Sequence, residues 1–264
     1  MKIFIFKFKK KFFIFAALIL IIILYIIFSH NNADSIAIKL SADSILGKDI
    51  KEKISNNLTT NDDRIAYLTF DDGPTLKATG KILDILKEEN IKASFFVIGK
   101  YVAKHPELVK RAYDEGHYIA NHGYTHNNSK LYESNESFIS EIKNTDIEIG
   151  KAIGVPDYCA RVFRFPNGFM SSNYKARKKI SAKLLEDMGY TYVDWNCLNR
   201  DSERKYSRTQ LLNNLKKTSK NKGTLIVLMH DTSDVNDTPS ILKDSILYLK
   251  SQGYEFQNFY SLLE

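Results

Sequence analysis

Cysteine is scarce in this sequence of 264 residues, which contains only Cys159 and Cys197. Neither lies in a Cys-x-x-Cys pair, so a zinc site built from such pairs is excluded. One disulfide between them stays open, because sequence does not say whether the fold brings them together. We favour the interpretation that they are two small buried apolar side chains.

Net positive charge is also small beyond the N-terminus, although the whole chain carries a formal net charge of +7. Five lysines fall within the first eleven residues, and removing them leaves +2 for the rest. Nucleic-acid-binding domains usually carry a basic surface for phosphates, so that function class is disfavoured.

Internal repeats are absent too. The 44% hydrophobic and 26% charged residues are typical of one globular domain with a sizeable core.

The longest apolar run lies near the N-terminus, at residues 12–28, with lysines before it and polar residues after it. Since positive charge stays on the cytoplasmic side, we predict a single-pass transmembrane signal anchor at residues 12–29 of a cell-membrane protein, with residues 1–11 in the cytoplasm. The alternatives are a cleaved signal peptide and a buried core helix. Residues 30–63 are predicted to be an extracellular linker and residues 64–264 an extracellular globular domain.

Beyond residue 64, strand-like apolar runs alternate with segments of helical periodicity. Strands are predicted at residues 65–70, 93–98, 162–165, 190–193 and 224–229, and helices at 76–89, 106–115, 134–153, 173–188, 207–220 and 238–250. This alternation is typical of an α/β fold with a mostly parallel sheet or barrel. In such folds the functional residues gather where the strands end.

Side chains that can act as acids, bases, metal ligands or substrate contacts follow the predicted strands. They are Asp71 and Asp72, His122 and His126, Arg164, Trp195 and Asp201, and His230. Carboxylate, imidazole and guanidinium groups at successive strand ends predict one site at one edge of the sheet.

His122 and His126 are four residues apart, which can place two imidazoles on one side of a helical turn. Together with one carboxylate they would suit a catalytic Zn²⁺ or another divalent metal. Taken alone, the spacing also fits a structural pair, and the aspartates beside Gly73 and Pro74 also fit a turn or a helix cap. His230 ends an apolar strand, where it is either a general acid kept charged by a carboxylate or a satisfied core histidine.

Five short motifs resemble those of the polysaccharide deacetylases, metal-dependent carbohydrate esterases that remove acetyl groups from sugar polymers. The motifs are Thr-Phe-Asp-Asp-Gly-Pro at 69–74, His-Gly-Tyr-Thr-His at 122–126, Arg-Phe-Pro-Asn-Gly at 164–168, Asp201, and Leu-Met-His at 228–230. They occur in the family's order and extend over roughly residues 64–260. The resemblance implies an α/β fold of the distorted (β/α) barrel type.

The resemblance also implies a role for each of five residues in the site. Asp72, His122 and His126 would hold the divalent metal, Zn²⁺ in the first place, with Co²⁺, Ni²⁺ or Mn²⁺ as alternatives. Asp71 would be the base that takes a proton from the water that the metal activates for attack on the acetyl carbonyl. His230 would be the acid that protonates the leaving amine.

Further roles are implied for residues around these five. Arg164 would pair with Asp71, and Asp201 would pair with His230. The main-chain NH of Asn167 would stabilise the oxyanion, Val227 and Met229 would line the slot for the acetyl methyl group, and Trp195 would line the groove or belong to the core. The sequence departs from the family at Asn167, where an aromatic residue is usual, and at Ser202, where Trp is frequent, which places the sugar subsites in question.

The resemblance and the anchor together favour a deacetylase of N-acetylated amino sugars in a cell-surface polysaccharide, with peptidoglycan N-acetylglucosamine as the leading substrate. One alternative is a deacetylase of another N- or O-acetylated glycan, and a second is a non-catalytic glycan-binding relative. The second is disfavoured because every acid, base and metal position is filled. The expected partners are the acetylated glycan and the membrane, and neither nucleic acid nor an obligate protein partner is implied.

Overall fold

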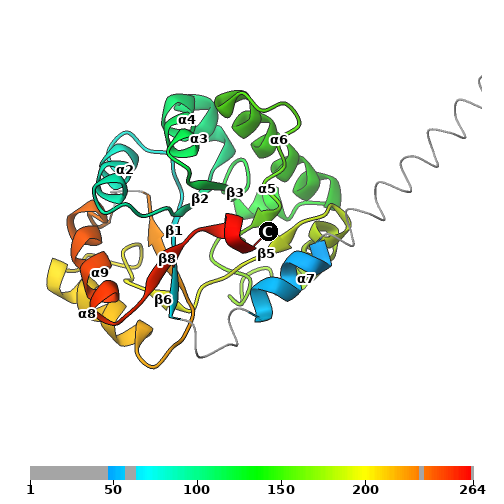
Figure 1. The fold of residues 1–264 in the computed structure, drawn as a ribbon. Helices are drawn as coiled ribbons and strands as arrows, with labels where there is room; N and C mark the ends of the chain where they lie inside the picture. Colours follow the sequence, from blue (N-terminus) through cyan, green and yellow to red (C-terminus); the bar gives the residue numbers. More distant parts are fainter. Residues whose placement is uncertain (1–46, 57–63, 232–234, 263–264) are drawn as a thin grey trace, which may run out of the picture.

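The computed structural model describes residues 47–56, 64–231 and 235–262 (Figure 1). Within these ranges, eight strands form one parallel sheet in the order β5-β4-β3-β2-β1-β7-β6, and β8 pairs with the first residues of β1. The strands are β1 (Ile65–Asp71), β2 (Ser94–Val97), β3 (Tyr118–Asn121), β4 (Val162–Phe163), β5 (Thr191–Tyr192), β6 (Cys197–Leu198), β7 (Leu225–His230) and β8 (Glu255–Gln257).

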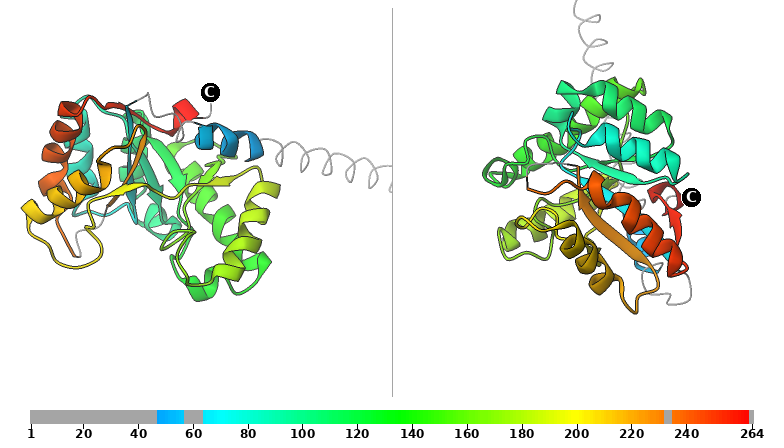
Figure 2. Two further views of the ribbon diagram at one scale, coloured as in Figure 1. Left: turned by 90° about the horizontal axis from the view of Figure 1, so that it is seen from below. Right: turned by 90° about the vertical axis from the view of Figure 1, so that its left-hand side faces the viewer.

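The sheet curls, and the helices lie around its outside (Figures 1 and 2). Among the described residues no pairing joins β5 to β6, so the expected barrel is a half-barrel that stays open on that side. The helices are α2 (Thr79–Glu88), α3 (Gly99–Lys104), α4 (Pro106–Asp114), α5 (Asn128–Leu131), α6 (Asn135–Ile153), α7 (Lys175–Asp187), α8 (Arg208–Ser219) and α9 (Pro239–Ser251), with the 3-10 helix η1 (Phe259–Leu262) near the end.

Local sequence signals set the ends of the two helices that matter most for the site. Helix α6 begins after Ser134, whose hydroxyl accepts a hydrogen bond from the Ser137 NH, and it ends at Gly154, where φ is 74°. Helix α8 begins with a capping box in which Ser207 and Gln210 each satisfy the other's main-chain NH. Helices α8 and α9 pack side by side on one flank of the sheet (Figure 2).

Strand alternation divides the core into two parts, because successive side chains of a strand point to opposite faces. In β1, Ala66, Leu68 and Phe70 point outward into the main cluster beneath the helices. Tyr67 points into the barrel and packs with Phe259 of η1. The inner face is therefore closed at one end by aromatic side chains and is free to carry polar groups at the other.

Residues 47–56 are helical, and Ile50 and Ile54 are buried in the inner cluster with Tyr67. Part of the segment predicted as a linker thus packs onto the domain. The boundary at residue 64 stays a prediction. The predicted anchor at residues 12–29 lies outside the described residues, and within those residues no helix is both long and apolar enough to cross a bilayer.

The predicted alternation of strands and helices is confirmed, with differences where elements are short. Helix α3 and strand β6 were not predicted, because a six-residue helix and a two-residue strand show no clear periodicity. Strands β4 and β5 also have only two residues each. Cys159 and Cys197 are both free, so the disulfide alternative is not realised, and Cys197 is buried as expected.

Candidate active site

Four inward-facing positions at the strand ends bring the reactive side chains together. Asp71 ends β1 and His230 ends β7, and these two residues are register partners across the sheet. His122 follows β3, and Arg164 follows β4. The parity that buries Tyr67 inside the barrel also directs Asp71 inward four residues later.

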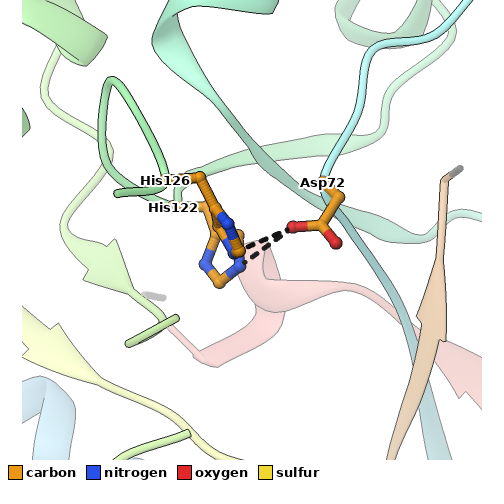
Figure 3. A group of neighbouring side chains, drawn as sticks. All are labelled: Asp72, His122 and His126. Atoms are coloured by element: carbon orange, nitrogen blue, oxygen red, sulfur yellow. Dashed lines mark ion pairs between the residues drawn. The ribbon is translucent and has the colours of Figure 1, made fainter. Parts of the chain in front are cut away.

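Asp72, His122 and His126 form a compact group (Figure 3). Asp72 Oδ1 lies 3.4 Å from His122 Nε2 and 3.2 Å from His126 Nε2. One potential ligand atom from each residue lies within 4.8 Å of the others. Asp72 has φ of 74°, a left-handed conformation that turns its carboxylate away from the line of β1 and toward the imidazoles.

The donor set fits a divalent metal. Asp72 Oδ1 is buried and has no hydrogen-bond partner among the described residues, as expected of an atom that serves as a ligand. His122 Nδ1 lies 2.7 Å from the Arg164 carbonyl, which only accepts, so Nδ1 carries the proton and Nε2 presents a lone pair to the site. Two imidazoles and one carboxylate with open positions are typical of catalytic zinc and of related divalent metals.

Ionisation of Asp72 and His126 suits metal binding. Burial raises the pKa of Asp72, but the close approach of His122 and the charges of the neighbouring histidines outweigh it and hold that pKa well below its usual range. Burial and the neighbouring His122 lower the pKa of His126. The carboxylate is therefore ionised and His126 is neutral near pH 7, the forms in which both act as ligands. Burial lowers the pKa of His122, but the charge of Asp71 and the contact with Asp72 outweigh it and raise that pKa, so a bound metal would displace a proton there.

The loop between the two histidines is held from behind by α6. Buried Glu141 accepts hydrogen bonds from the NH groups of Tyr124 (2.8 Å) and Thr125 (2.7 Å) and from the Thr125 hydroxyl (2.8 Å). One turn further along, Asp146 accepts a hydrogen bond from Asn121, directly before His122, at 2.9 Å. Helix α6 thus holds both ends of the segment that carries the histidines.

Asp71 is paired with a fully buried arginine. Arg164 Nη1 donates to Asp71 Oδ1 and to Thr69 Oγ1, both at 2.7 Å, and Nε donates to the Val193 carbonyl at 3.0 Å. The guanidinium also lies 4.0 Å from the centre of the Phe96 ring. These contacts leave Asp71 Oδ2 directed toward the pocket, 3.8 Å from His122 Nε2.

His230, on the strand next to Asp71, is paired with Asp201. Its Nδ1 lies 2.7 Å from Asp201 Oδ1, and its main-chain NH donates to Asp201 Oδ2 at 2.8 Å. The Thr238 hydroxyl donates to Oδ2 at 2.6 Å. Burial lowers the pKa of His230, but hydrogen bonding and charge from Asp201 outweigh it and raise that pKa to about 9. The imidazole is therefore charged at neutral pH.

One pocket of about 330 Å³ is lined by the reactive side chains, namely Asp71, Asp72, His122, His126, Asp201 and His230. Asn167, Trp195 and Ser202, which the sequence analysis placed at the sugar groove, line it as well. Asn167 has φ of 65°, and its side chain accepts a hydrogen bond from Asn128 at 3.0 Å. Trp195 also packs against Gly168, where a Cβ would lie 2.8 Å from the indole ring, so a residue larger than glycine would displace it.

The strand β7 corrects one prediction. Val227 and Met229, expected around the acetyl methyl group, belong to the main core beneath the helices. Leu228 lies between them and lines the pocket. Because side chains alternate along a strand, Leu228 and His230 share the inner face, and Val227 and Met229 share the outer one.

Three supporting residues were not identified from the sequence: Glu141, Thr238 and Thr79. Thr79 donates to both oxygens of the buried Asp231, at 2.9 and 2.7 Å, and a Cβ on Gly73 would meet Asp231 Oδ2 at 2.1 Å. Asp231 therefore limits residue 73, next to Asp72, to glycine. A signal existed for Glu141, because it stands with Ile142, Thr145 and Ile149 on the apolar face of the predicted helix.

Comparison with known proteins agrees with this geometry. The family described as polysaccharide deacetylase matches residues 59–193. A peptidoglycan-N-acetylglucosamine deacetylase of Bacillus cereus is 36% identical over 204 residues, which cover 75% of this chain and 70% of that protein. A peptidoglycan-N-acetylmuramic acid deacetylase of Bacillus subtilis is 30% identical over 201 residues, which cover 76% of this chain and 72% of that protein.

The fold has solved counterparts as well. The structure of a Streptococcus mutans CE4 esterase superposes with a TM-score of 0.70 at 29% identity, covering 78% of this chain and 90% of that one. The sequence match, the shared fold and the group formed by Asp72, His122 and His126 lead to one conclusion. The chain belongs to the polysaccharide deacetylase family and is a hydrolase that acts on amide bonds.

Proposed function

We propose that the protein is a cell-surface deacetylase that hydrolyses the acetamido group of peptidoglycan N-acetylglucosamine. The observation that carries the proposal is the arrangement of one pocket, in which Asp71 lies beside the metal-binding group and a charged His230 faces it. An acid and a base that line the same pocket, each held by its own partner, suit hydrolysis of an amide.

The metal proposed for Asp72, His122 and His126 is Zn²⁺. When bound, it supplies a Lewis acid that polarises the acetyl carbonyl and makes water more acidic. Asp71 Oδ2 accepts the proton of the attacking water, while Arg164 holds the other carboxylate oxygen and keeps Asp71 in place. The main-chain NH of Asn167 donates to the developing oxyanion.

His230 completes the reaction from the end of β7. Breaking the C–N bond requires a proton on the leaving nitrogen, since an amide anion is a very poor leaving group. His230 gives that proton from Nε2, because Nδ1 is engaged by Asp201. Leu228, on the same face of β7, provides an apolar wall for the acetyl methyl group. Trp195 and Asn167 then lie where the sugar ring enters.

The proposed location is the outer face of the cell membrane. The apolar run at residues 12–28, with lysines on its N-terminal side, supports an anchor that leaves the domain outside. The Bacillus cereus relative, whose name specifies N-acetylglucosamine in peptidoglycan, supports the choice of sugar. An anchored enzyme meets the wall glycan as its nearest polymer.

Mass spectrometry of peptidoglycan fragments tests this proposal. The full-length protein, in detergent micelles with added Zn²⁺, is incubated with purified peptidoglycan, which is then cut by a muramidase. We expect fragments that have lost one acetyl mass, with the loss assigned to N-acetylglucosamine by tandem fragmentation. His230→Gln, which keeps a polar group of similar size, serves as the inactive control.

Two other results overturn parts of the proposal. Loss of acetyl from N-acetylmuramic acid alone, the substrate in the name of the Bacillus subtilis relative, replaces the proposed sugar and keeps the reaction. Acetate release at the level of His230→Gln, on peptidoglycan and on acetylated xylan alike, refutes the enzymatic proposal. Zn²⁺ binding, followed by calorimetry, then shows whether the metal site alone is retained.

A further inference from the structure

One segment of the folded domain, after strand β6, has a large excess of positive charge. Residues 200–222 contain eight Lys and Arg and two acidic residues, a net charge of +6. Since the chain beyond its first eleven residues carries only +2, the remainder of it carries −4. The small net charge of the chain beyond its N-terminus is therefore a sum over this strongly basic region and a remainder that is acidic on balance.

This basic region lies directly beside the active site. It consists of the loop between β6 and α8 and the exposed face of α8. A second pocket, of about 420 Å³, lies between that loop and that face, and Arg200 lines both this pocket and the catalytic one. Arg204 and Lys217 line the second pocket as well, and none of the described residues that line it is acidic.

The second pocket is built from side chains held in place. Asn236 Nδ2 donates to the carbonyls of Asp201 and Arg204, both at 2.7 Å, and its Oδ1 accepts from the Tyr206 NH at 2.8 Å. The Arg204 guanidinium lies 4.8 Å from the centre of the Tyr206 ring. Asn236 thus fixes the loop whose first part, Asp201, also supports His230.

The cations of this pocket are available to a ligand. Among the described residues, neither Arg204 nor Lys217 has an ion-pair partner, whereas Arg208, on the far side of the loop, pairs with Asp244 at 3.2 Å. Arg200 pairs with Glu203 at 3.1 Å, but both side chains are nearly half exposed. Such an exposed pair is weak and can exchange one anion for another.

We propose that this pocket, the basic subsite, binds a carboxylate on a sugar that neighbours the acetylated sugar in the same glycan strand. The proposal rests on the proposed function, because it places the acetylated sugar at Asp71 and His230. Arginine guanidinium groups recognise carboxylates through paired hydrogen bonds, and Lys217 adds a third positive charge. The preferred substrate class is then an acidic glycan, and neutral amino-sugar polymers occupy only the catalytic pocket.

Matched substrates and matched charge reversals test this subsite. The substrates are acetylated peptidoglycan oligomers with free muramyl carboxylates and the same oligomers with those carboxylates converted to methyl amides. Lys217→Glu reverses one charge in the pocket, and Lys220→Glu makes the same change three residues further, outside it. Acetate release by the full-length Zn²⁺-loaded protein gives KM and kcat for each pair.

We expect wild type to have about a fivefold lower KM for the acidic oligomer, a preference that disappears in 0.5 M NaCl because salt screens exposed charges. Lys217→Glu raises that KM about fivefold, leaves kcat unchanged and does not alter the neutral oligomer, whereas Lys220→Glu has no effect. Equal KM values for both oligomers, or equal effects of the two variants, overturn the subsite.

Failure of the proposed function is recognised separately. If neither oligomer releases acetate, the reaction is refuted, and calorimetric titration of the same two oligomers into the protein still decides on the subsite. Tighter binding of the acidic oligomer, weakened by Lys217→Glu and not by Lys220→Glu, supports it. Equal binding of both oligomers refutes it.

Discussion

The metal-binding side of the pocket and its outer rim differ in how their side chains are held. Asp71 and His122 are almost completely buried, and each has partners that the fold supplies from behind: Arg164 for Asp71, and the Arg164 carbonyl for His122. At the rim, Asn167 and Ser202 are exposed and stand on irregular backbone. The residues proposed for catalysis and metal binding are thus held by the sheet, whereas those proposed to contact the sugar lie on loops.

This difference follows from where each side lies relative to the strands. Side chains at strand ends share the parity and the hydrogen bonding of the sheet, so their positions are fixed within the core. Loop side chains can change without cost to that core. Substitutions should therefore have large effects on turnover at the metal-binding side and small effects at the rim, with positioning residues between them.

The largest effect is expected for Asp71→Asn. The amide keeps the shape of the carboxylate but accepts no proton at neutral pH, so kcat should fall about 10³-fold, within the usual range for removal of a general base. Zn²⁺ affinity should change much less, since Asp72 and both histidines remain. Acetate release and calorimetric metal titration measure the two quantities.

Because Asp71→Asn also leaves Arg164 buried beside a neutral group, stability has to be measured in parallel. Circular dichroism at the assay temperature shows whether the variant is folded. A folded variant whose turnover stays within tenfold of wild type would assign the base to another residue.

A smaller effect, with a distinct pH dependence, is expected for Asp201→Asn. Asp201 is the main cause of the raised His230 pKa of about 9, whereas burial alone lowers it. Without the carboxylate, only the charges of Asp71 and Asp72 still oppose burial, so His230 loses its proton at lower pH and the alkaline limb of the kcat profile should move from near 9 to lower pH. At pH 8 we expect turnover to fall about 10- to 100-fold.

The pH profile separates this role from simple damage to the site. Thr238→Val removes a hydrogen bond to the same carboxylate without removing its charge, so it should lower kcat with little movement of the alkaline limb. An Asp201→Asn profile that is lower everywhere but unshifted would mean that His230 is not the titrating acid.

An effect on metal binding alone is expected for Glu141→Gln. Glu141 holds the loop between the histidines through three hydrogen bonds, and an amide presents only one acceptor oxygen in place of two. Zn²⁺ affinity should fall about tenfold, as is usual when the supports of metal ligands are lost. At saturating Zn²⁺, kcat should return close to the wild-type value.

Glu148→Gln on the same helix is the matched control, because among the described residues Glu148 has an ion pair only with Lys151, near the surface. Competition with a fluorescent zinc chelator measures both affinities. If Glu141→Gln lowers the melting temperature of the metal-free protein but leaves Zn²⁺ affinity unchanged, Glu141 supports the fold and not the metal site.

The difference between residues at strand ends and residues on loops also explains what could be predicted from the sequence. Asp72, His122 and His126 follow apolar strands, and strand ends of a parallel sheet converge, so their meeting was predictable. The pairing of Arg164 with Asp71 was implied by family resemblance, and the 2.7 Å contact agrees with it. The alternation of side chains along β7 also predicts which residues face the pocket. It favours Leu228, on the same face as His230, over Val227 and Met229 as the wall for the acetyl methyl group.

Other features depend on contacts distant in sequence, which no local pattern reports. Thr238 reaches the site from the residue before α9, whereas Glu141 on α6 left only the indirect sign of an acid on an apolar helix face. The basic subsite emerges only when the loop after β6 is placed beside the catalytic pocket, because averaging charge over the domain hides it. Periodicity also gave no sign of β6, whereas the other two-residue strands, β4 and β5, lie within predicted strands.

The smallest effect is expected at the rim, for Asn167→Gly. Glycine removes the side chain and keeps the left-handed backbone, where φ is 65°, so the main-chain NH proposed for the oxyanion stays in place. Loss of an exposed side chain should change the binding free energy by about 0.5 kcal/mol, which corresponds to about a twofold change in KM with kcat unchanged. Asn167→Tyr, which restores the aromatic residue usual at this position, should instead lower KM by adding a face for the sugar ring. A fall of about two orders of magnitude in the turnover of Asn167→Gly would be well beyond the loss usual for a surface side chain. It would mean that the Asn167 side chain takes part in the reaction, as the residues on the metal-binding side do.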